Sequence, residues 1–479
     1  MKMFIPANLD IEKLLIEKPP HYIERFKRDN LIHIIHLISS IPATNKDLDI
    51  IDGFVPIYSP ILQKKIRNYK YYIDYLLNND IILTDNWYIK GQKSIGYKFV
   101  YKFSQGIKMI EIADSCLIKA IKNESRFAAT IKKKYKHLIK WYASDLQIDK
   151  KLAMHYIEED LQRKINNPSF LDFDSKTKSF KDPYNQFKCS ALNIERIAAG
   201  EFVLSIDDNV FRLHSTLSNL KSEIRNCISY RGRKLVSIDI KNSQPYLSVG
   251  ILNNYFWQPP DYSIYCKEAC INKISKSIKP IVFKSDKCFN SFIMLCKSAA
   301  NQSGSDLHRY KTLVEQGRFY EYLSEEIGKE LGIGYSNRRK VKAAVFQVLF
   351  TDNRFLGQEE AKPKKVFKTL FPTVYDLFAQ IKKSDKTSLP RLLQRLESHL
   401  MLLVITKRIA KEQPKLPIFT IHDSIITTVG NEGYVQKIVE EELKAAIGIT
   451  PKLSIEFWEP SNLKFKDGSI FYGENVIAA

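Results

Sequence analysis

Residues 416–428 read Leu-Pro-Ile-Phe-Thr-Ile-His-Asp-Ser-Ile-Ile-Thr-Thr, two short apolar runs on either side of the polar step His422-Asp423. This pattern predicts a β-hairpin whose turn presents the carboxylate of Asp423. A carboxylate at a buried hairpin tip is costly unless a cation neutralises it, so the pattern also indicates a cationic partner. Taken alone, however, one such Asp is better explained as an ordinary turn residue.

A second carboxylate of the same kind lies far upstream. Residues 234–239 read Lys-Leu-Val-Ser-Ile-Asp, an apolar strand that ends in Asp239 and is followed by a polar turn. Two carboxylates at the ends of adjacent strands can hold a pair of magnesium ions roughly 4 Å apart, the arrangement of in-line phosphoryl transfer. The two Asp residues therefore suggest metal-dependent chemistry if the chain between them supplies groups that bind a substrate.

The chain between them contains a helix with a basic edge. Residues 335–350 predict this helix, with Ser336 or Asn337 as its N-cap. Two cations and then two aromatic rings recur every four residues along one face: Arg338, Lys342, Phe346 and Phe350. The cations would suit the phosphates of a nucleoside triphosphate, and the rings its base and sugar. On spacing alone, an amphipathic helix with a solvated basic end is the simpler interpretation.

The order of these elements resembles motifs A, B and C of the family A DNA polymerases, an order shared with single-subunit phage and mitochondrial RNA polymerases. The motif B pattern of Arg, Lys and an aromatic residue is matched without a gap from Arg338 to Phe350. Residues 211–220 look like the Arg-Leu-Ser-Ser…Asn-Leu segment that precedes motif A, and residues 368–375 are similar to a Tyr-Pro segment between motifs B and C. The resemblance covers residues 190–475.

This resemblance implies a right-hand polymerase of α+β fold, with an antiparallel palm sheet, helical fingers and thumb-like helices. It implies that Asp239 and Asp423 hold two Mg²⁺ ions and that Lys342 acts in catalysis. Nucleotide-binding residues would be Arg338, Lys342, Phe346, Phe350 and Gln244, the last near the sugar. Residues in contact with nucleic acid would be Arg212, Asn219, Gln394 and His422.

Two departures concern the choice of sugar. The DNA polymerases of this family carry Glu five residues after the motif A Asp, and the RNA polymerases a small residue, whereas this chain has Gln244. Motif B usually ends in Tyr-Gly, whereas here Phe350 is followed by Thr351. The bulk of Gln244 favours deoxyribonucleotides, and the missing hydroxyl at Phe350 leaves ribonucleotides open.

We expect four regions along the chain: a basic N-terminal region at 1–108, a helical thumb-like region at 109–190, the palm at 191–249 and 390–479, and the fingers at 250–389. Residues 59–78 predict one basic amphipathic helix, and residues 81–103 a hairpin that carries Lys90, Lys93 and Lys98. Helix and hairpin together resemble a winged-helix module, a fold that binds duplex DNA in some proteins and protein partners in others. Residues 110–165 read as helical and basic.

Composition limits the class of protein and its compartment. A chain of 479 residues can form two or three domains, and a formal net charge of +21 suggests a polyanionic partner. Neither a run of eighteen apolar residues nor a signal-peptide core is present, which predicts a cytoplasmic protein without membrane contact. We also expect a monomer. Seven cysteines indicate reduced thiols, and the spacing of Cys266, Cys270, Cys288 and Cys296 does not predict zinc.

Together these features predict a template-directed nucleotidyltransferase, a DNA-directed DNA polymerase of a plasmid, phage or mobile element that uses Mg²⁺, nucleoside triphosphates and a DNA template and primer. A single-subunit RNA polymerase or primase with the same core is the nearest alternative. A non-catalytic DNA-binding replication or defence protein is a third, although both Asp residues and both motif B cations are retained. The N-terminal region has no Asp-x-Glu on a predicted strand, so a proofreading exonuclease is not expected.

Overall fold

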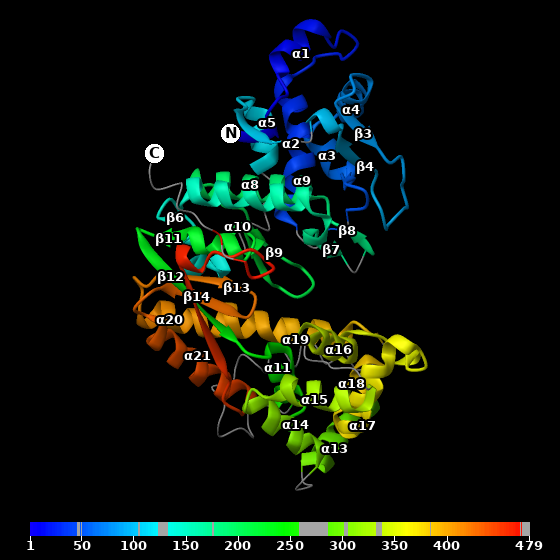
Figure 1. The fold of residues 1–479 in the computed structure, drawn as a ribbon, viewed down its shortest axis with the longest axis vertical. Coiled ribbons are helices and arrows are strands. Elements are labelled where there is room, and N and C mark those ends of the chain that lie inside the picture. Colours follow the sequence, from blue (N-terminus) through cyan, green and yellow to red (C-terminus); the bar gives the residue numbers. More distant parts are fainter. Residues whose placement is uncertain are drawn as a thin grey trace. The chain divides into compact units, whose positions relative to one another are not determined.

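The structure is a computed structural model, which describes the chain except for residues 46, 47, 49, 104, 105, 123–132, 175, 176, 258–285, 301–304, 332–337, 384, 470 and 472–479. The chain forms two compact units (Figure 1). The first unit comprises Met1–Ser205, His214–Leu235 and Trp458–Ala479, and the second comprises Ile206–Leu213 and Val236–Phe457. Residues 191–205 and 214–235, which we expect in the palm, therefore belong to the first unit.

The first unit is built from short helices and small antiparallel sheets. Its helices are α1 (Ile11–Glu17), α2 (Arg28–Thr44), α3 (Ser59–Lys65), α4 (Tyr69–Asn78), α5 (Ser115–Lys122), α7 (Lys136–Ile139), α8 (Lys150–Asn166), α9 (Pro183–Ala198) and α10 (Thr216–Asn219). Its strands are β1 (Lys2–Pro6), β2 (Val55–Pro56), β3 (Ile82–Thr84), β4 (Gly96–Phe99), β5 (Ile107–Glu111), β6 (Leu146–Ile148), β7 (Phe173–Asp174), β8 (Ser179–Phe180) and β11 (Ile228–Tyr230).

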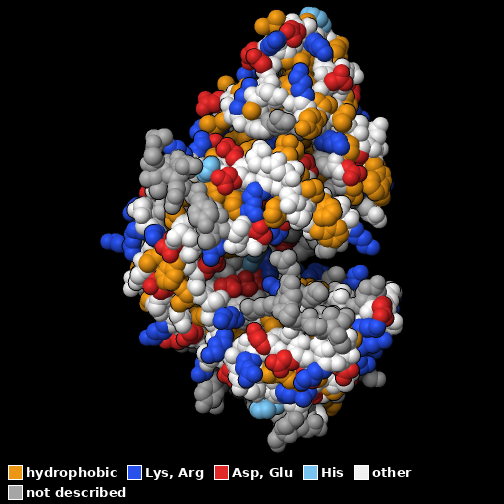
Figure 2. All heavy atoms as spheres, viewed as in Figure 1, with side chains coloured by type: hydrophobic (Ala, Val, Ile, Leu, Met, Phe, Trp, Pro, Cys, Tyr) orange, Lys and Arg blue, Asp and Glu red, His pale blue; other side chains and the backbone are white. Residues whose placement is uncertain are grey.

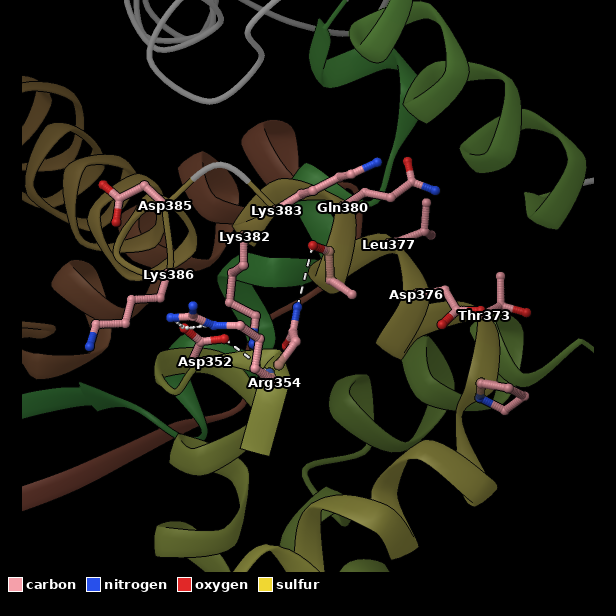
Figure 3. Close-up of a pocket in the computed structure, with 13 residues that line it drawn as sticks. Asp352, Arg354, Thr373, Asp376, Leu377, Gln380, Lys382, Lys383, Asp385 and Lys386 are labelled. Atoms are coloured by element: carbon pink, nitrogen blue, oxygen red, sulfur yellow. Dashed lines mark hydrogen bonds and ion pairs between the residues drawn. The ribbon is translucent and has the colours of Figure 1, made fainter. Parts of the chain in front are cut away.

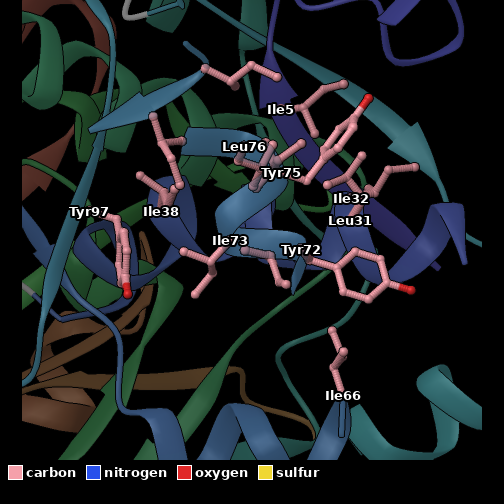
Figure 4. Close-up of a cluster of buried hydrophobic side chains, with 14 of the residues drawn as sticks. Ile5, Leu31, Ile32, Ile38, Ile66, Tyr72, Ile73, Tyr75, Leu76 and Tyr97 are labelled. Atoms are coloured by element: carbon pink, nitrogen blue, oxygen red, sulfur yellow. The ribbon is translucent and has the colours of Figure 1, made fainter. Parts of the chain in front are cut away.

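An apolar core fixes the N-terminal part of this unit (Figure 4). Helix α2 buries most of one side, and Leu31, Ile32 and Leu76 are fully enclosed together with Tyr72 and Tyr75. The polar ends of both tyrosines are satisfied, because the Tyr72 hydroxyl accepts from the amide of Lys27 at 2.8 Å and the Tyr75 hydroxyl donates to the carbonyl of Lys18 at 2.7 Å. These bonds let large rings enter the core without leaving buried polar atoms unpaired.

Two predictions for this unit are wrong in detail. The single helix expected at residues 59–78 is two helices, α3 and α4, because Ile66 adopts an extended backbone and buries its side chain in the core. The stretch 110–165 is not helical throughout, because β6 pairs antiparallel with β11. The expected hairpin is present as β3–β4, joined by β2 in a three-stranded sheet, and its identity as a winged helix stays a prediction.

The second unit combines a sheet with a helical region. Its helices are α11 (Ser243–Ile251), α13 (Asp286–Ala300), α14 (Asp306–Glu315), α15 (Phe319–Leu331), α16 (Arg338–Phe350), α17 (Lys362–Leu370), α18 (Pro372–Lys382), α19 (Ser388–His399), the π-helix η8 (Leu400–Ile405), α20 (Thr406–Glu412) and α21 (Glu432–Ile447). Its hairpin consists of β13 (Ile418–Ile421) and β14 (Ser424–Thr428). Four strands belong in part to each unit: β9 (Leu204–Ile206), β10 (Leu213–Ser215), β12 (Arg233–Ile240) and β15 (Leu453–Trp458).

The sheet of the second unit is antiparallel where its register is defined and carries the predicted hairpin. Strand β13 pairs with β14 from Ile418↔Thr427 to Ile421↔Ser424, so His422 and Asp423 form a two-residue turn. Strand β14 lies beside β12, and β15 also pairs with β12. Helix α11 packs against α19 and α21, and α19, η8 and α20 follow one another as one long helix (Figure 1). The α+β class is therefore confirmed.

Helices α13–α18 form the region that we expect as fingers. Helix α16 packs against α15, α17 and α19, and a cluster of buried rings joins the neighbouring helices. The cluster consists of Tyr310, Phe319, Phe367, Phe371 and Phe378. Helix α16 is therefore packed on one side against helices that are themselves held together by buried rings.

Some predictions fall on residues outside the described part of the chain. These are the caps Ser336 and Asn337 and the thiols of Cys266, Cys270 and Cys288. Cys296 is a buried free thiol, whose pKa burial raises to about 12. No helix among the described residues is both long enough and apolar enough to cross a membrane.

Candidate active site

The two predicted metal ligands meet where β12 lies beside β14. Asp239 is the last but one residue of β12, and Asp423 stands in the turn immediately before β14. The hydroxyl of Ser424 donates to Oδ1 of Asp239 at 2.6 Å. Because Ser424 directly follows Asp423, this bond ties the strand that carries one carboxylate to the turn that carries the other. The hairpin is thus confirmed, although Asp423 is half-buried and not fully enclosed.

The backbone of the two-residue turn between β13 and β14 has an unusual conformation. His422 has φ of +53°, a left-handed conformation that is unusual for a residue other than glycine. Two-residue hairpin loops favour turns with such angles, because these turns match the twist of the flanking strands. His422 is exposed beside Asp423, and its contact with nucleic acid stays a prediction.

The environment of Asp239 disfavours its charge. Burial, together with the neighbouring charges of Asp423 and Glu456, raises the pKa of Asp239 to about 6, against the opposing effects of the Ser424 hydrogen bond and the charge of Lys342. Two carboxylates that repel each other in a partly dehydrated place gain from a shared cation. The site therefore brings together residues from β12, the β13–β14 turn, α16 and β15.

The donor set suits a magnesium ion that is shared with a substrate. Mg²⁺ is usually held by one or two carboxylates and completes its shell with water and substrate phosphates. Among the described residues, no cluster of three His, Cys, Asp or Glu side chains could form a complete cage. Asp239 and Asp423 thus fit an ion whose remaining oxygen ligands come from water and a phosphate-bearing substrate.

Helix α16 presents part of the predicted ridge. Lys342 is exposed, and its Nζ lies 5.5 Å from the centroid of the Phe346 ring. The Phe346 and Phe350 rings are stacked, with centroids 5.0 Å apart and planes 22° from parallel. Arg338 begins the helix, and its side chain lies outside the described part. The opposite face is buried through Val341, Val345, Val348 and Leu349.

Two buried lysines hold the C-terminal end of α16. Lys382 donates to the carbonyls of Val348 at 2.6 Å and Thr351 at 3.0 Å, and Lys364 donates to the carbonyl of Asp352 at 2.8 Å. Burial, with the nearby charge of Lys364, lowers the pKa of Lys382 to about 7. Figure 3 shows Lys382 reaching toward the segment of Asp352 and Arg354 along a pocket of about 980 Å³. Cations at the C-terminal end of a helix interact favourably with the negative end of the helix dipole, and they donate hydrogen bonds to the last backbone carbonyls.

A buried carboxylate that the sequence analysis missed holds two of the predicted site residues. Glu397 of α19 is 1% exposed and accepts from Arg212, Nε to Oε1 at 2.9 Å and Nη2 to Oε2 at 2.9 Å. It also accepts from Nε2 of Gln244 at 2.8 Å. Burial raises the pKa of Glu397 to about 7 against the opposing effect of Arg212, and the charge of Asp423 adds to the rise.

Gln244 is held in one orientation by this contact. Its side chain is 7% exposed, and its Oε1 has no hydrogen-bond partner among the described residues. An unpaired buried acceptor is costly, so the atom suits a donor supplied by a ligand.

The other predicted contacts are distributed over both units. Gln394 is half-buried on α19, in the same helix as Glu397. Arg212 keeps 22% of its side chain exposed beside Glu397. Asn219 belongs to the first unit, where its amide donates to the carbonyl of Thr44 at 2.9 Å. The contact of Asn219 with nucleic acid therefore stays a prediction.

The missed residues carry different signals in the sequence. Glu397 lies four residues after Leu393 and three before Leu400, so a carboxylate occupies an apolar helix face, which is detectable. Ser424 adjoins Asp423 and looks like any turn residue. Glu456 is brought close by the pairing of β15 with β12, which no local pattern predicts.

Solved structures of similar fold include a polymerase domain. The structure matches the POL domain of Pol1 from M. smegmatis, a family A DNA polymerase, in its complex with DNA primer-template and dNTP. The match covers 73% of each chain at 10% identity with a TM-score of 0.39. No protein-family model and no curated protein matches the sequence. The roles of individual residues therefore rest on the geometry of the site.

The raised pKa of Asp239 makes a prediction for stability without divalent cations. A carboxyl whose pKa rises from 3.8 to about 6 on folding contributes stability below pH 4 that is lost as the pH rises through 6. Asp239→Asn should remove this loss, which amounts to at most about 3 kcal/mol. Urea unfolding in EDTA at pH 4 and pH 8 should show a smaller decline for the variant than for wild type. Parallel declines in both proteins would contradict the assigned environment.

Proposed function

We propose that this protein is a template-directed nucleotidyltransferase, a DNA-directed DNA polymerase of a plasmid, phage or mobile element. The observation that carries the proposal is the bond of Ser424 to Asp239, which draws Asp239 and Asp423 together beneath the charge of Lys342. These residues come from the segments that resemble motifs A, B and C of the family A polymerases. A coincidence of three distant segments at one pair of carboxylates supports chemistry more strongly than any motif alone.

In the proposed reaction, the 3′-hydroxyl of a primer attacks the α-phosphorus of a nucleoside triphosphate. A new phosphodiester bond forms, the bond to the β-phosphate oxygen breaks, the hydroxyl proton leaves to solvent or a base, and pyrophosphate departs. Asp239 and Asp423 would hold Mg²⁺, which when bound lowers the charge on the phosphates and the pKa of the attacking hydroxyl. Lys342 would bind the triphosphate and protonate the leaving pyrophosphate.

The remaining residues would select and position the nucleotide. The stacked rings of Phe346 and Phe350 give a flat apolar surface for base and sugar. Gln244, fixed by Glu397, would stand at the sugar, while Arg212 and Gln394 would contact the nucleic acid.

A single-subunit RNA polymerase is the second candidate, and one observation favours it. The unpaired Oε1 of Gln244 could accept a hydrogen bond from a ribose 2′-hydroxyl, and Phe350 offers no hydroxyl of its own. The bulk of the same side chain favours a deoxyribose. The DNA polymerase and RNA polymerase candidates therefore differ in whether Gln244 excludes the ribose 2′-hydroxyl or accepts a hydrogen bond from it.

Removal of either carboxylate charge should abolish nucleotide addition. Asp239→Asn and Asp423→Asn keep the shape of each side chain but replace a charged metal ligand with an amide. Primer extension should be lost, while binding of a primed template stays close to wild type. Asp208→Asn, at an exposed position of the same unit, should extend normally. Extension at the wild-type rate by either site variant would rule out the proposed reaction, and a binding protein would then remain.

Lys342→Ala should slow incorporation at least about 100-fold, because a cation aimed at developing phosphate charge acts mainly in the transition state. Single-turnover incorporation with a saturating primed template measures this rate. The matched control is Lys407→Ala, which removes an exposed lysine from α20. A loss of template affinity without a change in rate would make α16 a duplex-binding element.

Gln244→Gly should raise the use of ribonucleotides relative to deoxyribonucleotides. Exclusion of one small group is worth about 10- to 200-fold in selectivity, which sets the size of the gain. Single additions of dATP and ATP by wild type and variant measure it. Glu397→Gln, which keeps the volume of the side chain but weakens the hold on Arg212 and Gln244, should shift selectivity in the same direction by less. A wild-type preference for ATP would replace the DNA polymerase proposal with the RNA polymerase candidate.

A further inference from the structure

The loop between β3 and β4 in the first unit displays large rings to solvent. Trp87 is 49% exposed, Tyr88 61% and Ile89 37%. The loop extends from the sheet as a long ribbon in Figure 1, and Figure 2 shows exposed hydrophobic side chains among Lys and Arg on the visible face of this part of the chain. An exposed apolar group of this size usually marks an interaction site.

The loop is held in shape by its own contacts. The carboxylate of Asp85 accepts from the amides of Trp87 at 3.1 Å and Gly96 at 2.8 Å, and from the ammonium of Lys93. That ammonium also lies 4.2 Å from the centroid of the Trp87 ring. Ile89 bridges to Lys93, which closes the tip. The rings are thus displayed by an ordered hairpin extension, so little conformational entropy would be lost on binding.

The stretch of sequence that carries the rings is strongly basic. Between residues 57 and 103 the sequence has eight Lys and Arg residues and three Asp residues. The cations are Lys64, Lys65, Arg67, Lys70, Lys90, Lys93, Lys98 and Lys102. Lys90 stands next to Ile89 at the tip and is exposed. Rings flanked by cations fit a partner that alternates flat apolar faces with negative charges.

We propose that this loop, residues 85–95, binds an unpaired polynucleotide. Trp87 and Tyr88 stack on successive bases, and Lys90 lies along the phosphates. Base faces are accessible to stacking only where they are unpaired, so a duplex offers this surface phosphates alone. The inference goes beyond the proposed polymerase reaction and does not depend on it, because it concerns binding without nucleotides or catalysis. In a polymerase, such a site would hold template that has not yet been copied.

The test is fluorescence anisotropy of a labelled oligothymidylate of about 15 nucleotides with the full chain and no nucleotides. The double variant Trp87→Ala/Tyr88→Ala should bind at least about 30-fold more weakly, because stacking on each of the two rings is worth about fivefold or more. Tyr71→Ala, which removes an equally exposed ring from α4, should bind like wild type. Lys90→Gln should lower the slope of log affinity against log salt by about 0.7.

Intrinsic fluorescence gives a second readout that does not depend on the double variant. Trp257 and Trp458 are buried and Trp141 is half-buried, so the part of the quenching by the oligothymidylate that disappears in Trp87→Phe, which still binds, reports on contact with Trp87. An oligouridylate arm separates RNA from DNA, and tight binding of either supports the stacking site. Unchanged affinity in the double variant, or a duplex that binds as well as the single strand and loses as much affinity in that variant, would overturn the inference.

Asp239→Asn separates this inference from the proposed function. This variant should keep wild-type affinity for the oligothymidylate while it loses primer extension. If the wild-type protein extends no primer but shows the Trp87-dependent binding, the polymerase proposal fails and the binding site stands. If primer extension is normal and the double variant binds the oligothymidylate like wild type, the binding-site inference fails and the polymerase proposal stands.

Discussion

The contact between Ser424 and Asp239 is the constraint on which the rest of the second unit depends. Two carboxylates in a partly buried place repel each other, so the fold must hold them together against that repulsion. Neighbouring strands do this, because the register of β13 with β14 fixes the turn that carries Asp423. All four residues of β13 and four of the five in β14 are buried, so the hairpin cannot shift register without exposing them.

A second constraint acts on α16, which must present Lys342 and two rings without sliding. Its buried face packs on neighbouring helices, and Lys364 and Lys382 take up carbonyls at its C-terminal end. Burial of two lysines is unfavourable, as the lowered pKa of Lys382 shows. Such a cost is common where a surface is ordered for function, since an apolar residue would leave the helix carbonyls unpaired. The C-terminal end of α16 is thus held by two buried lysines, each of which is unfavourable to bury, and this hold keeps Lys342 and the two rings in place.

Local patterns in the sequence account for the hairpin at Asp423, the strand that ends at Asp239 and the ridge from Lys342 to Phe350, because each depends on residues a few positions apart. The break between α3 and α4 was not predictable, since it depends on the burial of Ile66 in a core built from distant segments. The placement of Asn219 in the first unit and of Glu456 beside Asp239 depends on tertiary pairing in the same way. Periodicity reports only the local part of the fold.

The group of Arg212, Glu397 and Gln244 shows how a substitution at one position is fitted to its surroundings. An amide at position 244 can donate through Nε2 to Glu397, which a second carboxylate there could not do at high pH. Glu397 also pairs with Arg212, so one carboxylate holds both the guanidinium of Arg212 and the amide of Gln244. One N–H of the Gln244 amide is taken by Glu397, while the acceptor Oε1 has no partner among the described residues and is open to a ligand. A sugar hydroxyl that donates to Oε1 would be accepted, and a sugar without one would meet the same atom unpaired. The choice of sugar then depends on whether Oε1 of Gln244 accepts a hydrogen bond from the ribose 2′-hydroxyl or the bulk of the side chain excludes that hydroxyl. Glu397 influences both outcomes, because its hydrogen bond sets the direction of the Gln244 amide.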